Sequence, residues 1–209
     1  MRKYIVEFIG TFFLSLTVCM TSIGASSEVT PIAIGAILLA FTYGGGYISG
    51  AHYNPAVTLA VWLKGKIETR DALFYMLAQV LASVAAALMV KYLFLANIGG
   101  WKSVIVSSSV SALAAEIVGT FGLCWVFLNV AVSRSVEGNN YYGLAIGFTL
   151  LCLTVSLGGI SGGAFNPAIA LGMSVAEKFS WGHWWVYLGG GFIGGALAST
   201  LYKYVNPDE

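Results

Sequence analysis

The feature that most constrains this chain is a series of apolar segments about as long as a bilayer is thick. A helix of ~20 apolar residues spans the ~30 Å hydrocarbon core. We place six such segments at 4–23, 31–50, 71–94, 107–131, 142–159 and 182–204. Charged residues make up only 9% of the chain, whereas a soluble domain carries ~25%. The sequence therefore predicts an all-α membrane protein with six transmembrane helices.

Lysine and arginine are unevenly distributed between the two sides that these spans define. With the N-terminus inside, the inner residues are Arg2, Lys3, Lys64, Lys66, Arg70, Arg134 and Lys203, and the outer ones are Lys91, Lys102 and Lys178. Positive residues accumulate on the cytoplasmic side of membrane proteins. We therefore expect an integral, multi-pass protein with both termini in the cytoplasm, placed in the plasma (inner) membrane and surrounded by lipid.

The composition also limits the chemistry. The net charge is +1 and no basic cluster of the size that nucleic-acid binding needs is present, so we expect no nucleic-acid partner. His52 and His183 are far apart, which argues against a metal site. We interpret Cys19, Cys124 and Cys152 as buried thiols, because all three lie in apolar segments. No catalytic set is visible, so we expect neither an enzyme nor a bound cofactor or metal.

An internal repeat carries most of the functional argument. The segment Ile48–Val61 (ISGAHYNPAVTLAV) matches Ile160–Met173 (ISGGAFNPAIALGM) at seven of fourteen positions, with an offset of 112. The sequences that begin at Glu7 (EFIGTFF) and Glu116 (EIVGTFG) also correspond. The chain is therefore a duplication of one unit.

The duplication divides the chain into repeats at 1–105 and 106–209, which we expect to form one structural domain. Three spans per repeat is an odd number, so the repeats must cross the membrane in opposite directions. Each repeat also holds a segment too short to span, at 54–64 and 166–176. Eleven helical residues reach only ~16 Å, about half of the hydrocarbon core. Inverted repeats with paired half-helices indicate a site at the middle of the membrane.

Each half-helix opens with the sequence Asn-Pro-Ala. Asn is a preferred N-cap, and Pro suits the first helical position. The inverted repeat brings the two helix N-termini together, each with about half a positive charge. The amides and dipole ends offer hydrogen-bond donors to a neutral molecule and repel cations. One such tripeptide alone is an ordinary helix cap, but two at matching places predict a pore midplane. Its residues are Asn54, Pro55, Ala56, Asn166, Pro167 and Ala168.

With both motifs, six spans and two half-helices, the chain resembles the aquaporin or major intrinsic protein family over nearly its whole length. The resemblance implies a homotetramer with one pore per protomer for water and small neutral solutes. It implies loop-supporting roles for Glu7, Glu116 and His52. It also implies a track of backbone carbonyls, from Gly50, Ala51 and His52 on the inner side and from Gly162, Gly163 and Ala164 on the outer side.

The chain departs from the family directly after the second Asn-Pro-Ala. Many members carry Arg there, and this chain has Ile169. The resemblance places Ile34, Thr154 and Gly163 beside it in the outer constriction. Ile offers no charge and Gly no side chain, so we expect a filter that is wider or differently shaped and is not specific for water. Ammonia, urea, glycerol and hydrogen peroxide are the candidate solutes, and the alternative is that Ile169 plugs the pore.

Glu7, Glu116 and His52 are polar residues at positions expected to be buried, and each has two interpretations. Carboxylates within a membrane are candidates for function, so Glu7 and Glu116 either couple protons or accept hydrogen bonds that hold the loops. His52 either senses pH or braces the first loop. In the last span, glycines four residues apart at Gly190/Gly194 and Gly191/Gly195 favour close helix packing.

The leading functional interpretation is a passive channel. A secondary transporter also has inverted repeats and broken helices, but it needs embedded ionisable residues, which are almost absent apart from the two glutamates. A poorly conducting structural membrane protein is the other alternative. Linear flux indicates the channel, saturable gradient-coupled uptake the transporter, and no flux above that of lipid the structural protein.

Overall fold

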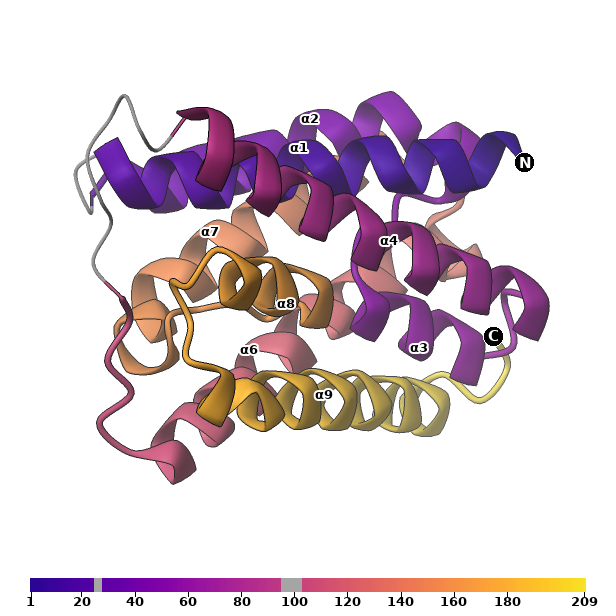
Figure 1. Ribbon diagram of the computed structural model, residues 1–209. Helices are drawn as coiled ribbons and strands as arrows, with labels where there is room; N and C mark the ends of the chain where they lie inside the picture. The colour runs from indigo at the N-terminus through magenta and orange to yellow at the C-terminus, as the bar shows by residue number, and fades with distance from the viewer. Residues whose placement is uncertain (25–27, 95–102) are drawn as a thin grey trace.

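The computed structural model of the protein describes residues 1–24, 28–94 and 103–209, and these residues form a bundle of helices (Figure 1). The long helices are α1 (Arg2–Gly24), α2 (Thr30–Ser49), α4 (Thr69–Met89), α6 (Ser109–Phe127), α7 (Tyr142–Ser161) and α9 (Trp184–Val205). The short helices are α3 (Pro55–Leu63) and α8 (Pro167–Val175). Both half-helices thus begin and end within a residue or so of the predicted limits. Lys102, counted above on the outer side, lies outside the described residues.

Short irregular turns extend several of the helices. They are π-helical at Val90–Phe94 and Leu128–Val132, which continue α4 and α6, and 3-10 at Arg134–Val136 and Trp181–His183. The π-helical turns lengthen α4 and α6 toward the membrane surface. The spans predicted at 71–94 and 107–131 therefore include these turns.

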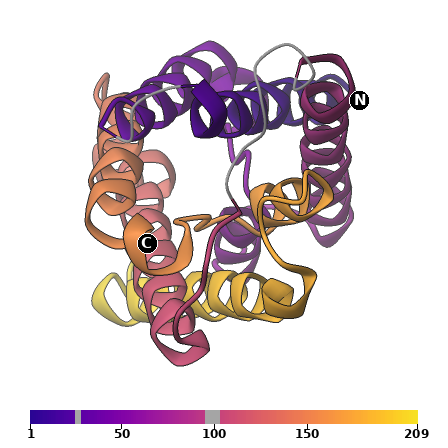
Figure 2. The ribbon, with the colours of Figure 1, turned by 60° about the vertical axis from the view of Figure 1, so that its left-hand side comes forward.

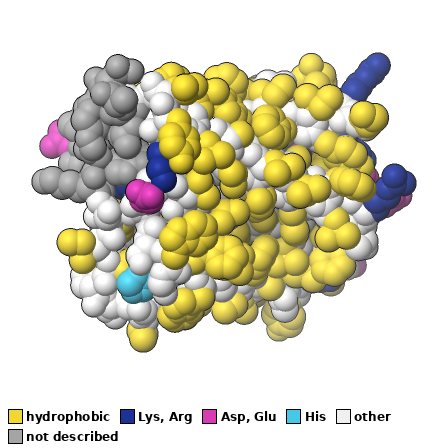
Figure 3. All heavy atoms as spheres, viewed as in Figure 1, with side chains coloured by type: hydrophobic (Ala, Val, Ile, Leu, Met, Phe, Trp, Pro, Cys, Tyr) yellow, Lys and Arg dark blue, Asp and Glu magenta, His cyan; other side chains and the backbone are white. Residues whose placement is uncertain are grey.

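Five of the helices are long and apolar enough to cross a membrane: α1, α2, α4, α6 and α7. The sixth, α9, has 22 residues and therefore a similar length of ~33 Å. Its sequence contains five glycines, which lower its hydropathy without shortening it. Figure 3 shows an apolar band around the middle of the visible face, with charged side chains toward both ends. An all-α membrane protein is therefore confirmed.

The long helices surround the two half-helices. α1 and α2 lie along one side and α9 along the opposite side, while α3 and α8 lie between them (Figure 1). Seen after rotation, the long helices form a ring around α3 and α8 (Figure 2). α1 packs on α4, α6 on α9, and α2 on α7, the last pair joining the two repeats. Both chain ends lie at the same end of the bundle.

The glycines of α9 allow it to pack directly against other backbones. A Cβ built on Gly194 would lie 2.6 Å from a carbonyl oxygen of α6. One on Gly195 would lie 2.7 Å from the carbonyl oxygen of Ala56, and one on Gly191 would lie 2.8 Å from Cγ of Pro167. The packing role predicted for these glycines is confirmed, and α9 supports the beginnings of both half-helices.

The C-terminal segment packs against the end of the bundle at which both chain ends lie. The Glu209 carboxylate accepts hydrogen bonds from the Ser133 hydroxyl (2.6 Å), the Ser135 hydroxyl (2.6 Å) and the Arg134 N–H (2.8 Å). Nζ of Lys64 donates to the Glu209 carbonyl oxygen at 2.7 Å. This segment therefore ties the end of the chain to the connection between α6 and α7.

The cysteines differ from the expectation in one case. Cys19 and Cys124 are buried, but Cys152 is exposed. The prediction for Cys152 is wrong because an apolar residue on a membrane helix can face either the protein core or the lipid. Position within an apolar segment does not distinguish the two.

Candidate pore at the meeting of the half-helices

The loops that precede the two half-helices share one unusual backbone conformation. In the first loop φ is 86° at Gly50, 53° at Ala51 and 48° at Tyr53; in the second it is 96° at Gly162, 67° at Gly163 and 45° at Phe165. Non-glycine residues rarely adopt such angles, which cost ~1–3 kcal/mol each and persist only when the surroundings hold them. Both loops therefore need strong external support.

Glu7 supplies this support to the first loop. Its Oε1 accepts hydrogen bonds from the Ser49 hydroxyl (2.7 Å) and the His52 N–H (3.0 Å). Its Oε2 accepts hydrogen bonds from the Tyr53 N–H (2.7 Å) and from Nε2 of Gln79 (2.8 Å). The side chain is fully buried. Four donors surround this carboxylate, and two of them belong to the loop backbone.

Glu116 makes the equivalent contacts in the second loop. Its Oε1 accepts hydrogen bonds from the Ser161 hydroxyl (2.6 Å) and the Ala164 N–H (3.0 Å), and its Oε2 accepts one from the Phe165 N–H (2.7 Å). Glu116 is also fully buried. The contacts repeat those of Glu7 apart from the amide of Gln79. Both glutamates thus lie where the loop-holding interpretation places them.

The asparagines cap the half-helices as their sequence predicts. Oδ1 of Asn54 accepts a hydrogen bond from the Ala56 N–H at 2.8 Å. Oδ1 of Asn166 accepts hydrogen bonds from the N–H groups of Ala168 (3.0 Å) and Ile169 (3.4 Å). Pro follows at the first helical position in each case. The capping oxygens therefore point along the helices and leave the amide nitrogens for other partners.

Those amide nitrogens bond across the boundary between the repeats. Nδ2 of Asn54 donates to the Phe165 carbonyl oxygen at 2.8 Å, and Nδ2 of Asn166 donates to the Tyr53 carbonyl oxygen at 2.9 Å. A primary amide has two N–H donors. Each asparagine therefore retains one N–H, and both residues line the central cavity. The structure thus brings the two motifs together.

The backbone carbonyls of the loops divide into occupied and free groups. The Tyr75 hydroxyl donates to the Ser49 carbonyl oxygen (2.7 Å), and the Tyr187 hydroxyl donates to that of Ser161 (2.6 Å). In each loop, three carbonyls lie between the one bonded by the tyrosine and the one bonded by the asparagine amide. Within the described part of the chain, no protein donor reaches any of these three. The free carbonyls belong to Gly50, Ala51, His52, Gly162, Gly163 and Ala164. These are the residues of the predicted carbonyl track.

The central cavity has one polar and one apolar wall. Its volume is about 20 Å³, room for about one water molecule. The polar wall comprises Asn54, Asn166 and the second loop from Gly163 to Phe165. The apolar wall comprises Leu14, Val18, Ile34, Leu38, Leu123, Leu150 and Ile169. A molecule in this cavity therefore meets hydrogen-bonding groups on one side only.

The residues of the predicted constriction lie at two levels. Ile34, Gly163 and Ile169 line the central cavity, whereas Thr154 lines the outer vestibule beyond it. A Cβ on Gly163 would lie 3.0 Å from Cα of Gly158, so the backbone of α7 occupies the space that a side chain would fill. Gly163 therefore leaves no gap, so its missing side chain does not widen the passage as the sequence had suggested.

A wider hollow lies beyond each end of the central cavity, and we name these the outer and inner vestibules after the orientation predicted from the sequence. The outer one has a volume of about 680 Å³ and includes Thr154, Gly162, Glu28 and Lys178 in its lining. The inner one consists of two hollows of about 770 and 460 Å³ that share Gly50 in their lining. The small central cavity thus lies between two wider hollows.

The first loop has a polar network that the second lacks. His52 lines the inner vestibule, and its Nδ1 lies 3.1 Å from the Thr58 hydroxyl oxygen. Nε2 of Gln79 donates to the same hydroxyl oxygen at 3.0 Å. At the offset of 112, Thr58 and Gln79 correspond to Ala170 and Gly191. The contact of His52 with α3 is the one that a bracing residue makes.

Sequence reasoning missed several of these groups. Tyr75 and Tyr187, which bond the loop carbonyls, were not identified, although they are separated by the repeat offset of 112. Extending the alignment of the repeats beyond the motifs would have found them. Among the residues that the structure describes, no group of three or more His, Cys, Asp or Glu side chains could hold a metal ion.

Comparison with known proteins adds to this geometry. The sequence profile described as Major intrinsic protein matches residues 1–202. The chain is 34% identical to "Glycerol uptake facilitator protein-like 6" of Lactiplantibacillus plantarum, over 100% of both chains. It is 32% identical to "Aquaporin AqpM" of Methanothermobacter marburgensis, over 99% of this chain and 98% of the other. The aquaglyceroporin structure from Plasmodium falciparum superposes with a TM-score of 0.84 at 22% identity, covering 99% and 97% of the two chains, and shares the fold.

Proposed function

The chain belongs to the major intrinsic protein family, a family of membrane channels for water and small solutes, and from this premise we propose which residues form its pore. The midplane is built by Asn54 and Asn166 at the N-termini of α3 and α8. The observation that supports this assignment is the pair of asparagine amides, each bonded to the opposite loop with one N–H left over. A passive, water-filled route through these groups needs no moving part.

The proposed path runs along the free carbonyls of the two loops and past the asparagines. A neutral solute exchanges water for carbonyl acceptors and amide donors along the polar wall, while the apolar wall offers it no partner. A cation loses much of its hydration and meets two helix N-termini, each with about half a positive charge. The path therefore favours uncharged molecules.

We propose small uncharged solutes with a polar edge, as well as water, as the permeants. Ile169 and Ile34 supply neither a charge nor a donor at the narrowest level, so a solute passes with an apolar face against them. Ammonia, urea, hydrogen peroxide and glycerol are all small and uncharged, and glycerol and urea also have a less polar edge or face that can lie against these side chains. One relative is named a glycerol uptake facilitator-like protein and another an aquaporin, which agrees with this range.

A passive channel fits the glutamates better than a coupled transporter does. Glu7 and Glu116 are fully buried, and their carboxylates are surrounded by loop and side-chain donors. A group that binds and releases a proton or ion during transport has to exchange it with the pathway. Neither glutamate lines the central cavity or a vestibule. We also propose that the chain is not an enzyme, because the family to which it belongs consists of channels.

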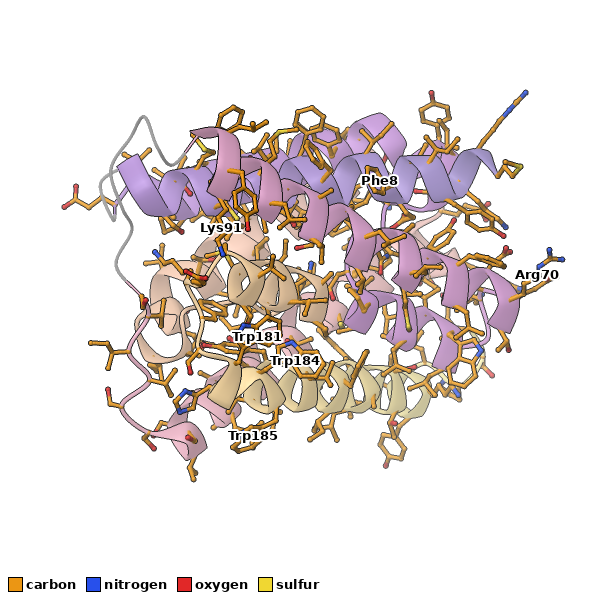
Figure 4. The ribbon with its side chains drawn as sticks, in the orientation of Figure 1. Phe8, Arg70, Lys91, Trp181, Trp184 and Trp185 are labelled. Carbon is orange, nitrogen blue, oxygen red and sulfur yellow. The ribbon has the colours of Figure 1, made fainter. Side chains whose placement is uncertain are left out.

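We further propose a homotetramer in the plasma (inner) membrane with both termini in the cytoplasm. The two chain ends lie at one end of the bundle together with Arg70, while Lys91 and the labelled tryptophans lie toward the other end (Figure 4). Tryptophans favour the membrane interface, and basic residues favour the cytoplasmic side. The tetramer follows from the family resemblance, and cross-linking of the membrane-embedded protein tests it.

Stopped-flow light scattering on proteoliposomes tests the channel and its constriction together. We compare water, urea and glycerol in the wild type, in Ile169→Arg and in the apolar control Ile169→Val. The expected result is fast, non-saturating solute flux in the wild type and the control. In Ile169→Arg we expect a fall of at least about tenfold for urea and glycerol, a barrier increase of ~1.4 kcal/mol, with water retained.

Three other outcomes would contradict parts of the proposal. Equal solute flux in Ile169→Arg and the wild type would show that Ile169 does not lie at the constriction. Saturable, gradient-coupled uptake would indicate a transporter. Flux no greater than that of empty liposomes would indicate a structural membrane protein.

A further inference from the structure

The outer vestibule has an unusual electrostatic setting for a pore mouth. α7 ends beside it, and Gly158, Gly159 and Gly162 form part of its lining. The C-terminal end of a helix carries about half a negative charge. The constriction below has Ile169 and therefore no charge. With nothing else present, this mouth would attract cations toward the pore.

Lys178 is the basic residue in the lining of this vestibule, among the residues described. Its backbone is held at both ends: the N–H donates to the Met173 carbonyl oxygen (2.8 Å), and the carbonyl accepts from the Val104 N–H (2.9 Å). Its Nζ donates to the Ser22 carbonyl oxygen at 3.3 Å. The half-buried side chain thus reaches from the end of α8 to the end of α1, across one side of the mouth.

The charge of Lys178 is not neutralised by an ion pair. The described residues form two ion pairs, and Lys178 takes part in neither. The one on the side of the outer vestibule joins Lys91 to Glu177, the residue before Lys178, at 2.8 Å. Glu28 lines the same vestibule, but it is exposed and forms no ion pair with Lys178. Partial burial lowers the pKa of the Lys178 ammonium group. Water screens Glu28 more than it screens the half-buried ammonium.

We propose that Lys178 is a specificity-determining residue that supplies the fixed positive charge of the outer mouth and excludes cations from the pore. In this chain the charge stands in the vestibule instead of at the constriction, where Ile169 leaves the filter uncharged. A neutral solute passes such a charge without penalty, whereas a cation is repelled by it. The inference rests on the proposed channel function and adds the residue that discriminates by charge.

Guanidinium and urea form a suitable pair of probes, because both are small and planar and they differ by one charge. We measure tracer influx of each into proteoliposomes at low ionic strength, with the membrane potential held at zero by potassium and valinomycin. The variants are Lys178→Met, Lys178→Gln and the charge-conserving Lys178→Arg. Lys91→Met is the matched control, since it removes a lysine from the same side outside the vestibule lining.

The expected result is a guanidinium-to-urea ratio that rises about three- to tenfold in both neutral variants, as removal of one charge near a partly screened path predicts. Lys178→Arg and Lys91→Met should keep the ratio of the wild type. The difference should shrink at high salt, where the Debye length falls to ~3 Å.

The outcomes separate this inference from the channel proposal. An unchanged ratio in both neutral variants, with urea influx intact, would overturn the role of Lys178 and leave the channel standing. A ratio that rises equally in Lys91→Met would show a general surface-charge effect and would also overturn it. Absence of urea influx in the wild type would instead contradict the channel itself.

Discussion

Replacing Glu116 by Gln tests how the second loop is held. The carboxylate accepts hydrogen bonds from the Ser161 hydroxyl and from the N–H groups of Ala164 and Phe165. A glutamine of the same shape has one carbonyl oxygen and one NH₂ group. If its oxygen takes the place of Oε1, it keeps the first two donors, and its NH₂ group then faces the Phe165 N–H.

The loss of stability expected for Glu116→Gln follows from the one hydrogen bond that it loses. The Phe165 N–H is left without an acceptor inside the protein, and a buried unsatisfied donor costs ~1–3 kcal/mol. Phe165 also has a positive φ of 45°, a conformation that the lost hydrogen bond helps to hold. At ~2–4 °C per kcal/mol for a chain of this size, the apparent Tm should fall by roughly 2–12 °C.

Thermal unfolding in detergent and solute flux in proteoliposomes together measure the effect. Unfolding of membrane proteins is commonly irreversible, so the half-life at one temperature is recorded beside the apparent Tm. Glu177→Gln is the matched control, because it makes the same chemical change at an exposed ion pair, which contributes little to stability. Glu116→Gln should lose both stability and solute flux, and the control should lose neither.

One result would refute the reasoning. If Glu116→Gln were as stable as the wild type and lost only gradient-driven uptake, the carboxylate would be a proton-coupling group. The loop would then be held by something other than the hydrogen bonds described, and the transporter interpretation would gain support.

Two further changes test the packing and the chain end. Gly195→Ala places a Cβ 2.7 Å from the Ala56 carbonyl oxygen, so it should destabilise the protein by ~1–3 kcal/mol and reduce solute flux. The control Gly44→Ala meets nothing within 4 Å and should be tolerated. Equal unfolding half-lives of the two variants would contradict the close contact at Gly195. The Ser133 and Ser135 hydroxyls and nearby backbone N–H groups lower the pKa of Glu209 to about 2. The carboxylate therefore contributes its full stabilisation at any pH above the ordinary pKa of a glutamate, and this stabilisation is lost as the pH falls toward 2. Glu209→Gln should therefore be less stable than the wild type at pH 7, and the difference in apparent Tm should close in acid; a constant difference would contradict this.

The sequence predicted the half-helices closely because their limits depend on local chemistry. Asn54 and Asn166 are N-caps followed by Pro, a combination that specifies where a helix begins whatever surrounds it. The spans were predicted for a similar reason, since apolar length alone decides whether a helix can cross a bilayer. The one weak case is α9, whose glycines serve packing at the expense of hydropathy.

Contacts between distant segments were not predictable in the same way. The bonds of each asparagine amide to the opposite loop depend on how the two repeats meet, which no single motif encodes. The side on which Cys152 lies depends on which face of α7 packs against α2. Thr154 lines the vestibule and Ile34 the cavity, a difference that counting residues back from the motifs does not provide. The roles of these residues in conduction stay predictions until flux is measured.

The glycines of α9 have a consequence for how the protein is made. The ribosome completes α3 well over a hundred residues before it reaches Gly195, against which the Ala56 carbonyl packs. At ~5–20 residues per second, roughly 7–26 s pass between these events. During this interval the first half-helix lacks its final neighbour, and for most of it also the Asn166 amide that bonds its loop. Nascent chains halted before α9 should therefore present this loop to the insertion machinery or to proteases, and the last helix acts as the closing step of assembly.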